Sequence, residues 1–128
     1  MNKGINQYRQ IDVETDLHNA SPHRLIQMLF EGALKSIASA KGELQSGTPV
    51  GVSQHISRAV KIVGGLEEAL DKEAGGELAD SLERLYQHIQ DSLVLAQAEK
   101  SESQLDQIAL LLIELKEGWD QIAPTKGA

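Results

Sequence analysis

The chain has 128 residues, a net charge of −7 at pH 7, no cysteine and only 3% aromatic residues. This length is typical of one domain with its own core. The negative charge disfavours nucleic acids and acidic membrane surfaces as partners, because both require clustered Lys and Arg. Without cysteine, disulfide scaffolds and thiolate chemistry are excluded. No apolar run reaches the roughly 18–20 residues that span a bilayer, and the first ten residues lack a signal-peptide core. We therefore expect a soluble cytoplasmic protein without membrane insertion.

Residues 1–20 are polar with weakly spaced apolar positions, and we interpret them as an N-terminal arm or a short extra helix. A helix should start at Ser21-Pro22, because Ser can accept a bond from a free N–H group and Pro presets the first turn. It should end near Gln45. Thr48-Pro49 is a second start of the same kind, and that helix should end near Glu73.

Gly75-Gly76 tolerates positive φ and predicts the break before a third helix at about 77–99. A fourth helix is expected at 104–122, and Pro124 should end it and leave 124–128 as a frayed tail. Apolar residues recur every three or four positions in all four segments, as on one face of a helix. The predicted inward positions are Ile26, Phe30, Ala33, Ile37, Ala40 and Leu44, then Val52, Ile56, Ala59, Val63, Leu66 and Leu70, then Leu78, Leu82, Leu85, Ile89 and Ala96, then Leu105, Ile108, Leu112, Leu115, Trp119 and Ile122.

The connections between these segments are short, and short loops favour antiparallel neighbours. The predicted fold class is therefore all-α, an antiparallel up-down four-helix bundle over residues 21–123.

Several apolar residues lie away from the inward stripes. Leu110 falls roughly opposite the stripe of the fourth helix, and Ile113 lies about 130° from it. Four more share this property: Leu25, Met28, Val94 and Leu95. One interpretation is that they are ordinary boundary residues or are covered by the arm. The other is that they line an elongated groove for a partner's amphipathic helix, with Ile5 and Tyr8 of the arm plugging it until the partner binds.

Catalytic patterns are missing. No Glu has a His three residues later, and the inward stripes carry no acid, so neither a metal nor another cofactor is expected. We expect His23, in the first turn of a helix, to be neutral and to take part in capping. His55 and His88 lack the Lys and Gly that a phosphotransfer histidine requires. No phosphate loop or nucleophile elbow is present, so the chain is not expected to be an enzyme.

Three segments stand in order along the chain: Ile5-Asn6-Gln7-Tyr8, the run ASPHRLIQMLFEGA at 20–33, and LLIELKEGW at 111–119. Together they resemble the FliS family of flagellar export chaperones. One departure is Phe30, where many members carry Tyr.

This resemblance implies a cytosolic antiparallel bundle that binds the disordered C-terminal segment of flagellin. Such proteins prevent premature polymerisation and deliver flagellin to the type III export apparatus, and some also contact the export gate or an anti-sigma factor. The family's Ile-x-x-Tyr element is implicated in partner binding, which places that role on Ile5 and Tyr8. The groove residues rest on the helical wheel alone. The alternatives are an adaptor bundle for a transcription or signalling partner, and a metal or phosphotransfer bundle.

Overall fold

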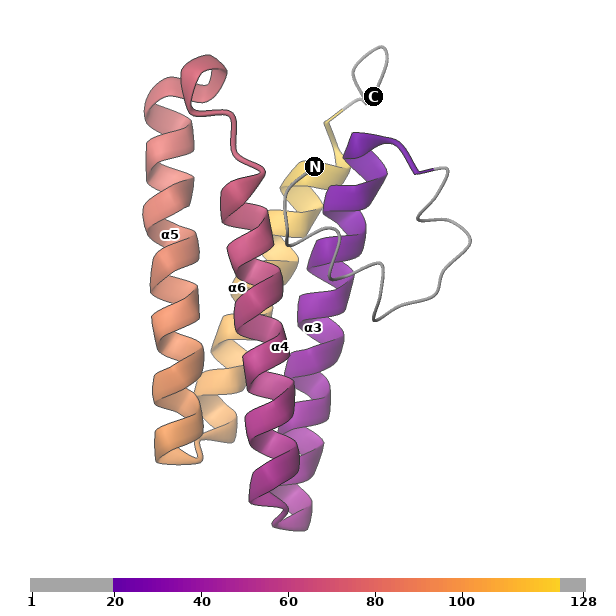
Figure 1. The fold of residues 1–128 in the computed structure, drawn as a ribbon, viewed down its shortest axis with the longest axis vertical. Coiled ribbons are helices and arrows are strands. Elements are labelled where there is room, and N and C mark those ends of the chain that lie inside the picture. The colour runs from indigo at the N-terminus through magenta and orange to yellow at the C-terminus, as the bar shows by residue number, and fades with distance from the viewer. Residues whose placement is uncertain (1–19, 123–128) are drawn as a thin grey trace.

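The structure, a computed structural model, describes residues 20–122. These residues form four helices and no strand: α3 (Pro22–Ser46), α4 (Pro49–Glu68), α5 (Lys72–Glu99) and α6 (Glu102–Asp120). The helices run alternately in opposite directions along one long axis (Figure 1). Each packs against its neighbours in the chain, and α6 also packs against α3. The predicted all-α, antiparallel up-down four-helix bundle is therefore confirmed.

Most helix ends follow from local hydrogen bonds. Ser21 Oγ accepts from the Arg24 backbone N–H at 3.1 Å, with Pro22 in the first turn as predicted. Gly47 ends α3 with a φ of 74°, a conformation that costs glycine least. Ser101 Oγ accepts from the Gln104 N–H at 3.1 Å and starts α6.

The boundary between α4 and α5 differs from the prediction. α4 ends at Glu68 rather than Glu73, because Asp71 caps a new helix by accepting from the Ala74 N–H at 3.1 Å. Gly76, with a φ of 52°, makes a kink inside the start of α5 instead of separating two helices. The break in helical conformation predicted at Gly75-Gly76 is therefore present, but it lies within the first turns of α5 and not before the helix.

The core runs the length of the bundle and contains most of the predicted inward residues. Its largest fully buried apolar side chains are Phe30, Leu29, Ile56, Ile89, Leu93, Leu105, Leu112 and Val63. Leu78 was predicted to point inward but is 68% exposed, and Ile122 is 51% exposed. The start of α5 reaches beyond the last turn of α4 (Figure 1), so its first turns have fewer neighbours to cover their side chains. Conversely Ile62, predicted at a flank, is buried.

No helix within residues 20–122 is long and apolar enough to cross a bilayer.

Candidate partner-binding surface

α6 crosses the bundle obliquely, from the end of α5 to the start of α3 (Figure 1). At its first turn, Gln104 Nε2 donates to the Glu99 carboxylate of α5. At its last turn, Trp119 contacts His23 of α3. The first turn of α6 also contacts α3, because Gln45 Nε2 donates to the Glu102 carboxylate at 2.9 Å.

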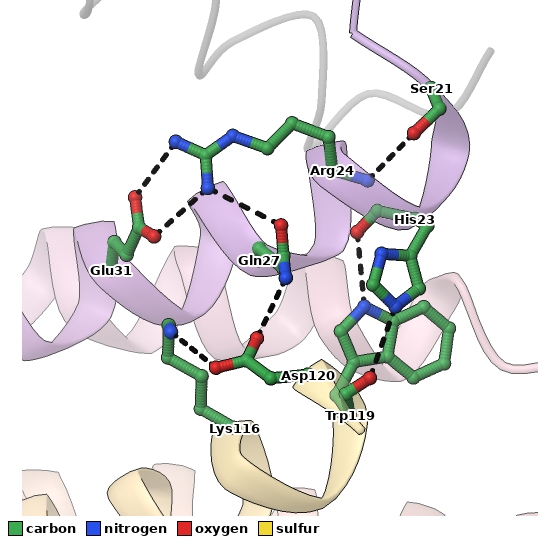
Figure 2. Close-up of polar contacts among 8 residues, drawn as sticks. All are labelled: Ser21, His23, Arg24, Gln27, Glu31, Lys116, Trp119 and Asp120. Atoms are coloured by element: carbon green, nitrogen blue, oxygen red, sulfur yellow. Dashed lines mark hydrogen bonds and ion pairs between the residues drawn. The ribbon is translucent and has the colours of Figure 1, made fainter. Parts of the chain in front are cut away.

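His23 and Trp119 form a reciprocal contact, the clasp, between the start of α3 and the end of α6 (Figure 2). The Trp119 indole Nε1 donates to the His23 carbonyl at 3.0 Å. His23 Nε2 lies 3.0 Å from the Trp119 carbonyl and carries the proton in this contact, because a carbonyl oxygen only accepts. The two rings stack with centroids 4.9 Å apart. His23 was expected to help cap its own helix, but its ring instead meets a backbone carbonyl at the C-terminal end of α6, far away in the sequence.

Polar side chains extend the clasp along the α3–α6 contact (Figure 2). Gln27 Nε2 donates to Asp120 Oδ1 at 2.8 Å, and Lys116 Nζ lies 2.7 Å from Asp120 Oδ2. The hydrogen bond from Lys116 is the main cause that lowers the pKa of the Asp120 carboxyl below its usual value. On α3 itself, Arg24 bonds to Gln27 and pairs with Glu31. The end of α6 is therefore fixed to α3 by aromatic, hydrogen-bonding and ionic contacts together.

An open hollow of about 390 Å³ lies between α5 and α6. Its apolar lining is formed by Ile89 and Ile108 of the core, the partly buried Leu111, and Leu95, which is 52% exposed. An apolar hollow of this kind can take large side chains from one face of an amphipathic helix.

Polar side chains surround this hollow: His88, Ser92, Gln104 and Gln107. Ser92 Oγ and His88 Nε2 lie 3.4 Å apart. None of the eight lining residues carries a carboxylate, a Lys or an Arg. A ligand entering here would meet apolar surface and neutral hydrogen-bonding groups rather than a fixed charge, apart from the histidine.

The structure distributes the predicted partner-binding residues over several surfaces. Leu95 lines the hollow. Val94 is 57% exposed but does not line it. Leu110 and Ile113 are 61% and 41% exposed on α6, also outside the hollow. The predicted exposure of these four side chains is confirmed, whereas their roles in binding stay predictions.

Two residues of α3 behave differently from these four. Met28 is only 6% exposed and belongs to the core, so its predicted position away from the core was wrong. The wheel failed here because α3 buries more than one stripe, and Leu29 and Gly32 are also buried beside Met28. Leu25 is partly buried against the core. Ile5 and Tyr8 lie outside the residues that the structure describes.

Several hollow-lining residues were not singled out from the sequence. His88, Ser92 and Leu95 follow one another at steps of four and three on α5, as do Gln104, Ile108 and Leu111 on α6. Each set shares a helix face, and this spacing was the available signal. It was masked because each set mixes polar and apolar residues.

Within the described residues, no three His, Cys, Asp or Glu side chains are grouped so that they could hold a metal ion. His55 is partly buried on α4, whereas His88 is exposed on α5.

Comparison with known proteins gives one consistent match. The family model described as "Flagellar protein FliS" matches residues 4–126. The chain is 43% identical over 121 residues to the flagellar secretion chaperone FliSB of Pseudomonas aeruginosa, which covers 94% of this chain and 96% of that protein. It is 37% identical over 122 residues to the flagellar secretion chaperone FliS of Salmonella typhimurium, covering 94% and 90%. The corresponding protein of Vibrio cholerae is 30% identical over 124 residues, covering 97% and 91%.

Proposed function

The chain belongs to the FliS family, and from that premise we propose that it is a cytoplasmic export chaperone for flagellin. It binds the disordered C-terminal segment of flagellin, prevents premature polymerisation and delivers the segment to the flagellar type III export apparatus. Relatives that carry the name flagellar secretion chaperone, at 43% and 37% identity over nearly the whole chain, support this role.

The observation that carries the proposal is the hollow between α5 and α6. A side chain such as Leu95, half-exposed at its edge, gains burial when an apolar partner covers it, worth about 25 cal/mol per Å² of apolar surface removed from water. The client segment would bind as an amphipathic helix with its apolar face toward Leu95 and Leu111. Gln104 and Gln107 would donate to or accept from polar groups of the client beside them.

This mode of binding explains why a chaperone of this kind can both hold and release its client. A disordered segment must be ordered on binding, which opposes association by roughly 2–5 kcal/mol or more. Apolar burial offsets that cost and leaves a moderate net affinity. A client helix whose apolar stripe lies against the chaperone cannot use the same stripe to polymerise.

The test is a titration of the full-length chain with a peptide of the flagellin C-terminal segment, followed by helicity and protease protection. Leu95→Asp should weaken binding at least about tenfold, because it brings an unpaired carboxylate into the apolar hollow. Leu78→Asp is the matched control. Leu78 is also on α5 and is 68% exposed, but it does not line the hollow, so its substitution should leave binding nearly unchanged.

No binding of the wild-type chain at micromolar peptide would remove the proposed function. Equal loss in both variants would instead contradict the hollow as the site while leaving the function intact. Pull-down from the native cytosol would then identify the partner, including the alternative class of transcription or signalling proteins.

We assign the arm a role in partner choice, since the family's Ile-x-x-Tyr element falls on Ile5 and Tyr8. Tyr8→Ala should weaken or deregulate partner binding with little change in melting temperature. The export gate and an anti-sigma factor are the additional partners to test with this variant. A large fall in melting temperature would show that the arm is structural instead.

A further inference from the structure

A second hollow lies at the end of the bundle where α3 turns into α4. Its volume is about 200 Å³, and we call it the turn hollow. It lies between the α3–α4 turn and the last turn of α5, and it shares no lining residue with the hollow between α5 and α6. In Figure 1 the α3–α4 turn reaches past the neighbouring ends of α5 and α6, so these helices cover it only in part.

The backbone of the turn and the core beneath it give the turn hollow its shape. Gly47 has a φ of 74°, a conformation that costs glycine least, and Pro49 presets the first turn of α4. The floor is apolar, because Val52 belongs to the core and Leu44 is partly buried against it. A cavity of about 150 Å³ can take benzene, so the turn hollow has room for one large apolar side chain.

Three polar side chains line the turn hollow beside this floor: Glu43, Gln97 and Lys100. Within residues 20–122, none of these three side chains makes a hydrogen bond or an ion pair. An apolar floor with a few unpaired polar groups around it is the usual composition of a binding site.

The charge of Glu43 is offset inside the protein. Its carboxyl carbon would lie 2.6 Å from a Cβ atom at Gly51, so any larger residue there would displace the carboxylate from the first turn of α4. Thr48 makes no side-chain capping bond, which leaves the positive end of the α4 dipole to Glu43.

The charge of Lys100 is not offset in this way. The carboxylate of Glu99 accepts from Gln104, and that of Glu102 accepts from Gln45. The two acidic side chains nearest to Lys100 in the sequence are therefore engaged elsewhere, and Lys100 itself is exposed. The carbonyl end of α5 favours a cation but leaves it a net positive charge, so the turn hollow presents this charge beside its apolar floor.

We propose that the turn hollow is a docking site for a short segment of a partner protein in which an acidic residue follows a large apolar one. The apolar side chain enters over Leu44 and Val52, and the neighbouring carboxylate pairs with Lys100. Glu43 accepts from a backbone N–H of the segment, and Gln97 donates to a carbonyl. Because the two hollows share no residue, this partner can bind while a client occupies the hollow between α5 and α6.

Recognition at this site depends on contact rather than on long-range attraction. The net charge of −7 repels an acidic segment at a distance. At physiological salt, charges more than about 8 Å apart are screened, so the direct pair with Lys100 decides the outcome. We therefore expect weak, reversible binding that follows the sign of the charge at position 100.

The probe is the capped dipeptide N-acetyl-Leu-Glu-amide, titrated into the isotope-labelled full-length chain and followed by NMR. Amide shifts should be confined to the turn hollow, including those of Gly47, Val52 and Lys100, with a dissociation constant of about 1–10 mM. N-acetyl-Ala-Glu-amide should bind at least about tenfold more weakly, because it leaves the apolar floor uncovered.

Charge reversal tests the ion pair separately. Lys100→Glu should lower affinity for N-acetyl-Leu-Glu-amide at least about tenfold and raise affinity for N-acetyl-Leu-Lys-amide, because the pair is recreated with opposite signs. Lys35→Glu is the matched control. It changes the net charge equally, but Lys35 is exposed on α3 and lines neither hollow, so binding should be unchanged. Both lysines are exposed, so both variants should fold normally.

Three results would overturn the docking site: no saturable shift at tens of millimolar peptide, shifts at Ser92 and Leu95 in place of the turn hollow, or equal losses in the two charge variants. Because no flagellin peptide is present, the outcome is independent of the proposed chaperone function.

Discussion

The clasp between His23 and Trp119 leads to a stability prediction in which the hydrogen bond and the ring stack can be measured separately. Trp119→Phe keeps an aromatic ring against the imidazole but removes the indole N–H, which donates to the His23 carbonyl at 3.0 Å. The loss of one partly buried hydrogen bond should cost about 1 kcal/mol. For a chain of this size, that corresponds to a fall of about 3–5 °C in melting temperature.

Trp119→Ala also removes the ring stack, with its centroid distance of 4.9 Å, and the apolar contact of the indole. An aromatic pair contributes about 0.5–1.5 kcal/mol beyond its area. Together with the hydrogen bond and the partial burial of Trp119, the free energy of unfolding should fall by about 3 kcal/mol in all. This is the low end for Trp→Ala substitutions, because the side chain is not fully buried.

A double-mutant cycle with His23→Ala separates the stack from the hydrogen bonds. Both hydrogen bonds of the clasp run from a side chain to a backbone carbonyl, so neither is shared between the two side chains. The coupling energy of the cycle therefore reports the stacked rings, and should be about 0.5–1.5 kcal/mol. Urea denaturation followed by circular dichroism measures all three variants.

Ile122→Ala is the matched control, because Ile122 is close to Trp119 in the chain, 51% exposed and outside the clasp. It should change stability by less than about 0.5 kcal/mol. If Trp119→Phe is as stable as the wild-type chain, the indole N–H contributes nothing. If the coupling energy is zero, the stack does not hold α6 to α3 and the argument fails.

Three further predictions concern other parts of the bundle. Leu112→Ala, at a fully buried position of α6, should cost roughly 2–5 kcal/mol in chemical denaturation and affect client binding only through folding. The pKa of Asp120 is lowered by its hydrogen bond from Lys116, so the stability it provides is present above the carboxyl's ordinary pKa and is lost as pH falls through the lowered value. Asp120→Asn should therefore flatten the acid limb of the stability–pH profile below about pH 4, while Lys116→Ala should give a similar flattening by removing the bond. Lys100 ends α5 with a φ of 53°, a conformation that costs glycine less than lysine. Lys100→Gly should therefore raise the free energy of unfolding by about 1 kcal/mol or less, measured as a small rise in melting temperature. A lower melting temperature would show that Lys100 is not strained.

The start of each of the first two helices could be predicted because the signal is local. Ser21-Pro22 gives both the bond acceptor and the fixed φ of a first turn. At Thr48-Pro49 only the proline acts in this way, because the Thr48 side chain accepts no capping bond. The end of α4 was predicted wrongly because a stronger local signal lay beyond it. The apolar pattern continues through Leu70, and the competing cap at Asp71 was a weaker signal than Gly75-Gly76.

The contacts that position the candidate surfaces could not be predicted in this way. His23 and Trp119 are 96 residues apart, and nothing near either residue specifies the other. Sequence periodicity gives the direction of a side chain around its own helix, but not the angle at which two helices cross. That angle decides whether Leu95 and Leu111 close against each other or border a hollow.

Helical geometry gives three consecutive leucines of α6 different surroundings, although in the sequence they form one apolar run. They are Leu110, Leu111 and Leu112. A step of one residue turns the side chain by about 100°, so three consecutive leucines point to three sides of α6. Leu112 is fully buried, Leu111 lines the hollow, and Leu110 is 61% exposed outside the hollow. Because the clasp fixes the rotation of α6 against α3, it fixes all three directions at once. A polar substitution should therefore disturb folding at Leu112 and client binding at Leu111. The same substitution at the exposed Leu110 should leave folding unchanged, so it is the control for Leu112.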